Sequence, residues 1–322
     1  MGGFLRLPFV VPTGEFRRMK ISVIGVGKVG STLAFALSQR NFIRELVLVG
    51  RTREATLGDA LDIAHAQSFV EVPTRVVAGT VEDTAGSDII AVCASVPTPP
   101  KMADRATLGP ENVKLLRALL PPLVQRSPRA ILVMVSNPVD ALTYYAIQFT
   151  GWPTERVIGS GTLIDSARLR HELSLELGIH SSDLRAYILG EHGGSQFAAM
   201  SCATAGGEAI DDTPRRREII ARVVNAGLEI FSYKGHTNYG IALSATAIVE
   251  AIARDTKHTM PVSVAVDGFL DVKDVCLSLP AVVGRGGVER ILHPRLNDAE
   301  AQAFRASAAT VRRQIEEARL GL

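Results

Sequence analysis

The sequence predicts an α/β protein with a doubly wound parallel sheet and a second, α+β domain. Over the first half of the chain, short apolar runs alternate with helical patterns, and a glycine-rich turn follows the first run. The second half carries long helical patterns and one β-rich stretch. Strands that alternate with helices need crossover connections, and these connections place helices on both faces of a parallel sheet.

Length and composition fit a globular protein of about two domains. The chain has 322 residues, of which 47% are hydrophobic and 21% charged, so it can bury a sizeable core. The net charge is only +2 and aromatic residues make up 5% of the chain. The sequence therefore does not predict the basic surface or the base-stacking aromatic residues typical of nucleic-acid-binding proteins. No apolar run reaches the roughly 20 residues that span a bilayer. We therefore expect a small-molecule partner, with no nucleic acid and no membrane.

The cysteines and the first residues bear on compartment and domain limits. Cys93, Cys202 and Cys276 lie far apart, which excludes a disulfide framework and a CxxC metal cluster, so we expect a reducing cytoplasm and no metal. The apolar patch within residues 1–18 is short and broken by prolines, which does not suit a signal peptide. We expect an extension over 1–18, a dinucleotide-binding domain over 19–148 and a substrate domain over 149–322.

Apolar runs predict the strands, and apolar residues at helical spacing predict the helices. In the first half the strands are expected at 20–24, 45–49, 75–78, 88–94 and 130–135, and the helices at 29–39, 57–66 and 111–120. In the second half we expect helices at 163–177, 215–233, 241–254 and 298–318, and a β-rich stretch at 262–283.

A GxGxxG turn follows the first predicted strand and opens a helix. Its first glycine permits a tight turn, its second lets the backbone approach a pyrophosphate, and its third lets the helix pack closely on the strand. Glycine-rich turns also occur for purely structural reasons, but this position at the start of a strand–helix series favours a dinucleotide. We therefore expect a Rossmann-type domain that binds NAD or NADP. The expected contact residues are Gly25, Gly27, Lys28, Val29 and Gly30.

The end of the second predicted strand bears on the choice of cofactor. An NAD site has an acidic residue there for the adenosine ribose, but this chain has Gly50, followed by Arg51 and Arg53. The two arginines could bind the 2′-phosphate of NADP through paired hydrogen bonds, or they could simply decorate a surface loop. Because the missing acid and the gained bases occur together, we favour NADP(H) over NAD(H).

Four further segments occur in an order that is specific to one family. They are VSNPVD at 135–140, GSGTLIDSAR at 159–168, GEHG at 190–193 and KGHTNYG at 234–240. Together with the glycine turn they resemble the L-lactate/malate dehydrogenase family of NAD(P)-dependent L-2-hydroxy acid dehydrogenases. The resemblance runs from about residue 20 to the C-terminus. It implies reversible hydride transfer between a nicotinamide cofactor and a 2-oxo acid.

Three residues of these segments are candidates for the central chemistry. His192 is the candidate proton donor, because imidazole titrates near neutrality. We expect Asp165 to hydrogen-bond its ring and fix the tautomer. Arg168 lies one helical turn after Asp165 and could clamp the substrate carboxylate through two parallel hydrogen bonds. The alternative for Asp165 and Arg168 is an ordinary ion pair on a solvated helix.

The resemblance also implies roles for Asn137 and for the segment before the helix at 111–120. Asn137 would contact the substrate carbonyl and the nicotinamide region; its alternative is a turn-former before proline. The long segment 95–105 is more typical of a lid than of a connector. In the family this lid closes on the substrate and brings an arginine, here Arg105, to polarise the ketone. A solvated loop charge is the alternative for Arg105.

Substrate choice in the family also depends on the lid, which carries a glutamine in lactate enzymes and an arginine in malate enzymes. Thr98 aligns with that position and cannot pair with a second carboxylate, which argues against oxaloacetate. Lys101 could do so less well, so a malate dehydrogenase remains an alternative. Thr237 resembles the pocket wall of lactate enzymes. Gly194 stands where the family commonly has aspartate, and this departure bears on the geometry behind the proton donor.

Two arginines and the assembly complete the expectations from the resemblance. Arg170 and Arg185 match positions that, in many bacterial lactate enzymes, hold a sugar bisphosphate across a subunit interface. In those enzymes the pair is usually arginine and histidine, whereas this chain has two arginines. Two interpretations therefore remain: a site for an allosteric sugar bisphosphate, or two ordinary surface arginines. The family forms homodimers and homotetramers. A non-catalytic dinucleotide-binding sensor is the alternative from another class, but a sensor has no need of an acid/base pair.

Overall fold

The computed structural model describes residues 18–97 and 105–322 of the chain. The first half alternates strands with helices, and its six strands are parallel neighbours in the order β6-β5-β4-β1-β2-β3. The elements are β1 (Met19–Ile24), α1 (Lys28–Ser38), β2 (Ile43–Val49), α2 (Arg53–Ala66), β3 (Arg75–Ala78), β4 (Ile89–Val92), α3 (Gly109–Arg126), β5 (Ile131–Met134), α4 (Val139–Thr150) and β6 (Val157–Gly159).

The second half consists of helices, short β-pairs and a long antiparallel unit. Its elements are α5 (Leu163–Leu177), β7 (Leu184–Arg185), β8 (Ile188–Leu189), β9 (Phe197–Ala198), β10 (Thr204–Ala205), β11 (Glu208–Ala209), α6 (Pro214–Lys234), α7 (Tyr239–Arg254), β12 (His258–Asp267), β13 (Lys273–Gly284), β14 (Gly287–Ile291) and α8 (Asp298–Ala318). The expected α/β fold with a doubly wound sheet is confirmed.

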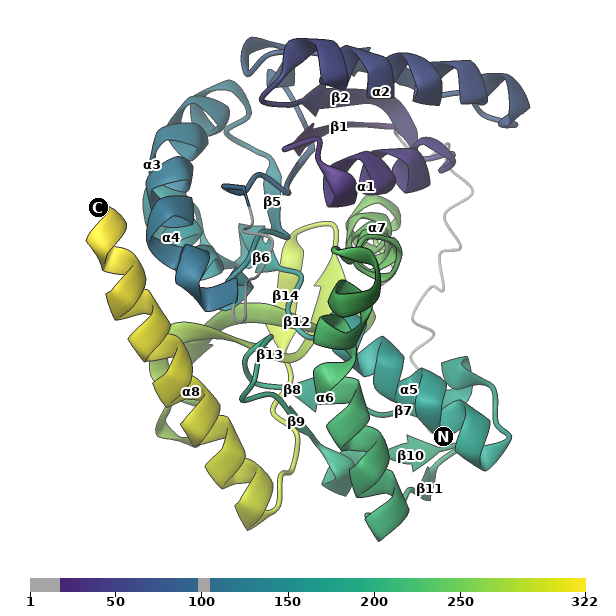
Figure 1. Cartoon of the computed structure of the whole chain (residues 1–322), viewed down its shortest axis with the longest axis vertical. Coiled ribbons are helices and arrows are strands. Elements are labelled where there is room, and N and C mark those ends of the chain that lie inside the picture. The colour runs from purple at the N-terminus through teal and green to yellow at the C-terminus, as the bar shows by residue number, and fades with distance from the viewer. Residues whose placement is uncertain (1–17, 98–104) are drawn as a thin grey trace, which may run out of the picture.

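One sheet runs through both halves. Strand β12 pairs antiparallel with β6 through Ser263 and Gly159, and β13 and β14 follow, so the sheet has nine strands in the order β14-β13-β12-β6-β5-β4-β1-β2-β3. The expected β-rich stretch therefore extends the first sheet as an antiparallel unit. In Figure 1 the strands pass from β1 and β2 at the top to β12 and β13 near the centre.

Helices cover both faces of this sheet, as the continuous apolar strands β4 and β5 require. Helices α3, α4 and α8 pack together on one face, and α1 packs against α7 on the other (Figure 1). The helix expected at 111–120 is longer than predicted, because α3 continues through Pro121 and Pro122 to Arg126. Leu120 and Leu123 are both buried, and this apolar face on either side of the prolines keeps the helix on the sheet.

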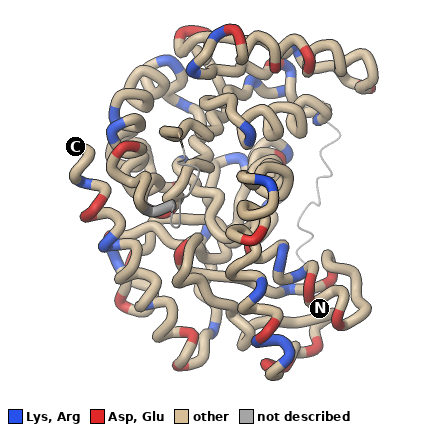
Figure 2. Tube along the Cα trace, in the orientation of Figure 1, with Lys and Arg blue, Asp and Glu red and all other residues tan. Residues whose placement is uncertain are grey.

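Two apolar clusters form inside the molecule. The larger one takes side chains from the sheet and from helices of both halves. A smaller one lies between α5, α6 and β7, and is built from residues such as Leu169, Leu173 and Val223. Surface helices such as α2 and α8 carry acidic and basic residues side by side (Figure 2). Within the described parts of the chain, no helix combines the length and the hydropathy needed to cross a membrane.

Candidate active site

The turn after β1 has the backbone geometry that a dinucleotide site needs. Gly25 has φ +94°, and a Cβ there would lie 2.3 Å from the backbone nitrogen of Ala94. A Cβ on Gly30 would lie 2.0 Å from the carbonyl oxygen of Gly25, so both positions require glycine. At Gly27, which caps α1, a Cβ would meet nothing within 4 Å. This open space at a helix N-terminus fits a pyrophosphate.

The other residues expected at this turn lie on α1. Lys28 is exposed and Val29 is half-buried, and the first turn of the helix carries no acidic residue. A positive side chain and unpaired backbone N–H groups therefore lie together at the end of the helix, where the helix dipole favours an anion.

The end of β2 shows why Gly50 is a glycine. A Cβ at this position would lie 2.0 Å from the hydroxyl of Thr56, which donates to the carbonyl of Thr52 at 2.8 Å. Glycine thus has a packing reason here that is independent of the cofactor. Arg51 and Arg53 are both exposed beside it.

His192 lies on a loop that follows β8 and is bonded to the sheet. Gly190 exchanges two backbone hydrogen bonds with Ser278 of β13, at 3.1 and 2.8 Å. Two residues later, Nδ1 of His192 lies 2.6 Å from Oδ2 of Asp165 on α5. The contact expected between the two side chains is therefore present.

Asp165 also pairs with Arg168, so one carboxylate joins two cations. Oδ1 of Asp165 accepts a hydrogen bond from Nη1 of Arg168 at 2.7 Å. Burial raises the pKa of the Asp165 carboxyl, but the charges and hydrogen bonds of His192 and Arg168 outweigh it and hold this pKa below its usual value. Asp165 is only 1% exposed, so this ion pair does not lie on a solvated helix face. The guanidinium of Arg168 keeps further N–H groups for a second carboxylate.

Hydroxyl groups hold α5 against the strand that leads to His192. Thr162 donates from its hydroxyl to the carbonyl of Ile188 at 2.5 Å, and Ser166 accepts the N–H of Ile188 at 2.9 Å. The backbone N–H of Thr162 donates to Ser278 Oγ at 2.9 Å. Because Ile188 is two residues before Gly190, these bonds fix Asp165 relative to the His192 loop.

Asn137 lies between β5 and α4, at the carboxyl edge of the parallel strands. Its carbonyl accepts a hydrogen bond from Asn112 of α3 at 2.8 Å, and Asn112 Oδ1 accepts the N–H of Val96 at 2.8 Å. Asn112 therefore joins the ends of β4 and β5, where ligands of parallel sheets bind. Asn112 was not among the predicted site residues; its polar side chain on the apolar face of a predicted helix was the available signal.

Thr237 is half-buried in the short connection between α6 and α7. The next residue, Asn238, donates to the hydroxyl of Thr32 on α1 at 3.0 Å and accepts from Lys234 at 2.7 Å. These contacts join the Thr237 segment to the helix that opens at the glycine turn. Thr237 is thereby held on the side of the second half that faces the dinucleotide-binding half.

Three predicted residues fall on the segment between β4 and α3. Thr98 and Lys101 lie outside the described residues, as do residues 1–17 of the expected extension. Arg105 begins a single helical turn before α3, at Arg105–Leu108, and its side chain also lies outside the description.

Comparison with known proteins assigns both halves of the chain. The family described as lactate/malate dehydrogenase, NAD binding domain, matches residues 19–159, and the one described as lactate/malate dehydrogenase, alpha/beta C-terminal domain, matches residues 162–320. The chain belongs to the lactate/malate dehydrogenase family. The resemblance drawn from the five motifs is thus confirmed.

Individual family members agree with this assignment. An L-lactate dehydrogenase from Synechococcus sp. (strain JA-3-3Ab) is 40% identical over 307 residues, which cover 94% of this chain and 100% of that protein. One from Clostridium botulinum is 38% identical over 310 residues, with 93% and 96% covered. The solved minor L-lactate dehydrogenase from Enterococcus mundtii, in a ligands-bound form, has a TM-score of 0.89 at 32% identity, with 94% and 99% covered. The chain is therefore a lactate-dehydrogenase-like oxidoreductase with an NAD(H)-binding domain.

Glu191 of the GEHG motif is a further buried carboxylate near His192. Glu191 is 4% exposed, and its side chain accepts from Ser195 and, at 2.5 Å, from Gln314 of α8. A Cβ at Gly194, where the family commonly has aspartate, would meet nothing within 4 Å. Gly194 is exposed, so a side chain at this position would point into open space, and the Asp165–His192 contact is present without the aspartate.

Arg170 and Arg185 are neighbours, as the resemblance requires of an anion site. Burial lowers the pKa of the Arg170 guanidinium, and the nearby charge of Arg185 acts in the same direction. Arg170 contacts the carbonyl of Ala186 at 3.5 Å, and Arg185 donates to that of Ser182 at 2.9 Å. Neither bond supplies a negative charge to the pair.

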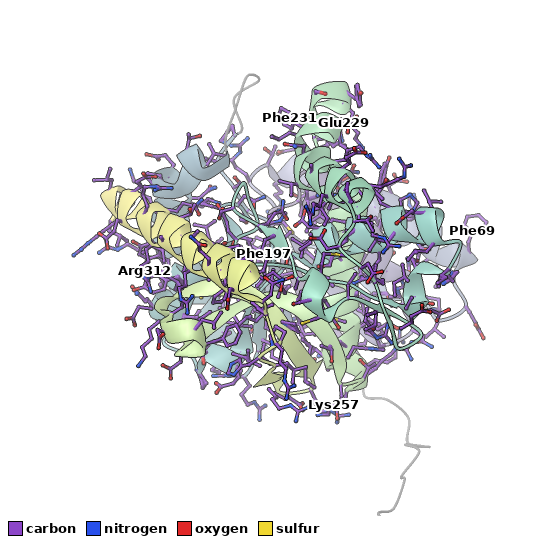
Figure 3. The ribbon with its side chains drawn as sticks, turned by 90° about the horizontal axis from the view of Figure 1, so that it is seen from below. Phe69, Phe197, Glu229, Phe231, Lys257 and Arg312 are labelled. Atoms are coloured by element: carbon purple, nitrogen blue, oxygen red, sulfur yellow. The ribbon has the colours of Figure 1, made fainter. Side chains whose placement is uncertain are left out.

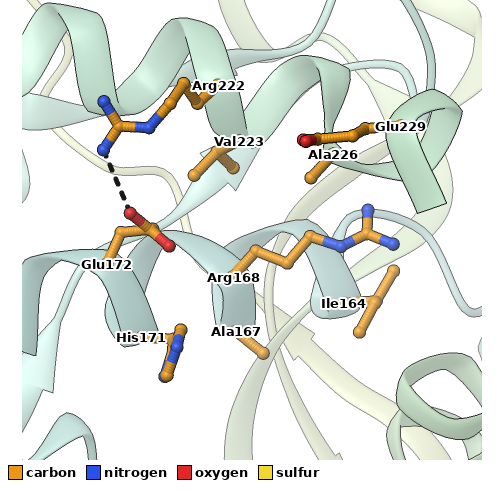
Figure 4. A pocket seen from close by; sticks show the side chains of 9 residues that line it. All are labelled: Ile164, Ala167, Arg168, His171, Glu172, Arg222, Val223, Ala226 and Glu229. Atoms are coloured by element: carbon orange, nitrogen blue, oxygen red, sulfur yellow. Dashed lines mark hydrogen bonds and ion pairs between the residues drawn. The ribbon is translucent and has the colours of Figure 1, made fainter.

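A partly open cavity of about 340 Å³ lies between α5 and α6. Figure 4 shows Arg168 and Ile164 at one end and the Glu172–Arg222 ion pair, 3.1 Å long, at the other. The same arginine that binds Asp165 therefore also reaches a surface opening. Elsewhere, in residues 18–97 and 105–322, no group of three or more His, Cys, Asp or Glu side chains could hold a metal ion.

Proposed function

We propose that the protein catalyses the reversible reduction of a 2-oxo acid of the pyruvate type to an L-2-hydroxy acid. The observation that carries this proposal is the chain of contacts His192–Asp165–Arg168, in which one buried carboxylate bonds a proton donor and a carboxylate clamp. The L-lactate dehydrogenases among its relatives support pyruvate as the first substrate to test.

Each residue has a distinct part in this proposal. Bound reduced nicotinamide supplies the hydride that the ketone carbon receives. Protonated His192 gives its Nε2 proton to the ketone oxygen, while Asp165 holds Nδ1 and stabilises the positive ring until the proton leaves. Arg168 binds the substrate carboxylate, and Asn137 holds the carbonyl beside the nicotinamide region. Arg105 polarises the ketone. Thr98 is uncharged, so it suits the methyl group of pyruvate better than a second carboxylate.

Replacement of the proton donor tests this function directly. We expect His192→Ala to lower kcat for pyruvate by about 100-fold or more, because general acid catalysis is lost, while the affinity for cofactor stays the same. Both are measured on the same preparation, by absorbance of the reduced cofactor and by its fluorescence on binding. Turnover of the variant at the wild-type rate would refute the role of His192. Preference of the wild type for oxaloacetate would favour a malate dehydrogenase that uses Lys101.

We further propose that NADP(H) is preferred over NAD(H), through Arg51 and Arg53. Replacing either arginine by alanine is expected to raise KM for NADPH about tenfold or more, since each removes charged hydrogen bonds to the 2′-phosphate. KM for NADH should not change. Arg44→Ala, at the opposite end of β2, is the matched control. A wild-type enzyme that uses NADH as well as NADPH would refute the preference.

An NAD-type acid can also be restored at the end of β2. Gly50→Asp alone would clash with Thr56, so the structure calls for the double variant Gly50→Asp/Thr56→Ala. We expect this variant to favour NADH, because its carboxylate accepts from the ribose hydroxyls and repels a 2′-phosphate.

We also propose that the Arg170–Arg185 pair binds a sugar bisphosphate. Two neighbouring guanidinium groups, each with a hydrogen bond to a backbone carbonyl, would be stabilised by a phosphate between them. Fructose 1,6-bisphosphate is expected to lower KM for pyruvate in the wild type, and to have no effect on Arg185→Ala. Unchanged activity and assembly of the wild type would refute this site.

A further inference from the structure

Asp140 contacts the catalytic loop from a third element. It is the second residue of α4, and its Oδ2 accepts the backbone N–H of His192 at 2.7 Å. Its Oδ1 accepts the hydroxyl of Ser263 at 2.5 Å, and Ser263 pairs with Gly159 where β12 joins β6. One carboxylate thus connects α4, the His192 loop and the junction between the two halves of the sheet. Asp140 is the last residue of the VSNPVD motif and was not among the predicted site residues.

The surroundings of Asp140 are almost free of water, since its side chain is 2% exposed. This burial raises the pKa of the Asp140 carboxyl to about 7, while the hydrogen bonds from Ser263 and His192 and the charge of His192 act in the opposite direction. Two other titratable groups face it. Glu191 adds a negative charge that raises the pKa of Asp140, and the buried thiol of Cys276 lies on β13. Among the described residues that influence the pKa of Asp140, His192 is the one that can become positive.

The interaction between Asp140 and His192 must act in both directions. Because a positive imidazole favours the ionised carboxylate, an ionised carboxylate equally favours the protonated imidazole. Two carboxylates therefore act on His192, Asp165 at ring atom Nδ1 and Asp140 at the backbone N–H. Protonated imidazole is the form that gives a proton to the ketone oxygen.

We propose that Asp140 is a positioning residue for His192, which fixes the main chain of the loop and favours the protonated ring through its charge. The proposal rests on the proposed role of His192 as proton donor. The same carboxylate also binds Ser263, so the proton affinity of the catalytic ring is coupled to the junction between β6 and β12.

The variant Asp140→Asn separates the charge from the hydrogen bond. Its Oδ1 can still accept the N–H of His192, and its amide can donate to Ser263, but the negative charge is gone. We expect the titration midpoint of the His192 ring to fall by about one pH unit. Above this midpoint kcat/KM for pyruvate should fall about tenfold, with KM little changed because Arg168 is untouched.

The ring is followed by NMR on histidine-labelled protein with bound cofactor, and His192→Gln identifies its signal. Ser263→Ala serves as a second variant in case Asp140→Asn does not fold. It keeps the carboxylate but removes a donor to it, so the midpoint should move in the same direction by less. Asp255→Asn is the matched control; Asp255 accepts the N–H of Arg285 near the end of α7 and should leave the midpoint in place.

The readouts distinguish this proposal from the function on which it rests. Unchanged midpoints in Asp140→Asn and Ser263→Ala would overturn the role of Asp140, even in an enzyme that reduces pyruvate. A lowered midpoint supports it, because a merely structural role would not move a proton equilibrium. If no 2-oxo acid is turned over, the proposed function fails, while the NMR titration still decides whether Asp140 sets the proton affinity of His192.

Discussion

Two buried aspartates contact the same histidine, and their pKa values move in opposite directions. Asp165 has a cationic group at each oxygen, His192 and Arg168, and these outweigh the effect of burial. Asp140 receives its hydrogen bonds from a hydroxyl and a backbone N–H, so burial dominates. The direction of each pKa is thus decided by the partners at the oxygen atoms, not by the degree of burial.

Asp165→Asn is expected to lower kcat about 100-fold or more, because an amide can bind the wrong tautomer of His192 and does not stabilise the positive ring. Cofactor affinity should be retained. Stopped-flow reduction of pyruvate and fluorescence titration with reduced cofactor measure the two quantities. Glu172→Gln on the same helix, which loses only its surface ion pair with Arg222, should match the wild type. Equal kcat in both variants would contradict a role for Asp165 at His192.

Asp140→Asn should gain stability relative to the wild type as pH rises. The pKa of Asp140 in the folded protein, about 7, lies above the usual aspartate value of 3.8. The stability that this group contributes is therefore fully present below about pH 4 and is lost as pH rises through about 7. The difference amounts to on the order of 4 kcal/mol between pH 4 and pH 8. Urea unfolding of both proteins at fixed concentration across this range measures it. A constant difference in unfolding free energy would contradict a raised pKa.

At the scale of elements, the turn between β1 and α1 uses its three glycines for different purposes. Gly25 and Gly30 are required because backbone atoms approach their Cα positions. A Cβ on Gly27 would point into open space, so we expect glycine there to make room for a bound pyrophosphate.

Alanine at Gly27 and at Gly30 should therefore have different effects. Gly27→Ala is expected to leave the melting temperature within about 2 °C of the wild type and to weaken cofactor binding about tenfold, since the methyl group enters the pyrophosphate site. Gly30→Ala should lower the melting temperature clearly, because its methyl group overlaps the carbonyl oxygen of Gly25. Calorimetry and cofactor titration test the pair. Loss of stability in Gly27→Ala would indicate a packing role instead.

Patterns along the chain predict those elements whose cause is local. Strand 75–78 and helices 163–177 and 298–318 have the predicted bounds, because periodic burial and clear end signals coincide. Two features depend on distant partners and escaped prediction. Helix α3 passes Pro121 because the sheet holds its apolar face, and β12 joins β6 through the single pair Ser263–Gly159.

The candidate site follows the same rule. His192, Asp165 and Arg168 could be selected from motifs, and the spacing of Asp165 and Arg168 on α5 gave a physical reason for their contact. Asp140 was missed because nothing in the local pattern of VSNPVD shows that its carboxylate reaches a loop 52 residues later in the chain. Asn112 was missed although its place on the apolar face of a predicted helix was visible in the sequence.

At the scale of the whole molecule, several large apolar side chains remain exposed on neighbouring helices. Leu57 and Leu61 of α2 are 46% and 50% exposed, and Phe35 of α1 and Leu243 of α7 are similar. Phe69, just after α2, is 93% exposed and lies at the edge of the molecule in Figure 3. Exposed apolar side chains on neighbouring helices are typical of surfaces that bind other proteins, and we propose that these helices join copies of the chain in a homodimer or homotetramer.

Leu57→Glu/Leu61→Glu should shift the protein toward monomer, because two charges would be buried at such an interface. Size-exclusion chromatography with light scattering gives the mass of both proteins. Leu320→Glu, which adds a charge near the C-terminal end, is the control and should assemble as the wild type does. A monomeric wild type at micromolar concentration would contradict the proposed assembly.

The junction between β6 and β12, at Gly159 and Ser263, also limits how domains of this protein can be exchanged with those of relatives. A cut near residue 160 would expose the unpaired edge of β6 on one fragment and of β12 on the other, and open apolar edges of this kind aggregate. Exchange of domains between relatives should therefore not use the boundary near residue 148 that the sequence predicts. The opposite end of the sheet is the better place, because β3 is the outermost of the described strands there. A graft confined to β2, α2 and β3 would replace the end of the expected cofactor site that faces the adenosine, and would leave the junction between β6 and β12 intact.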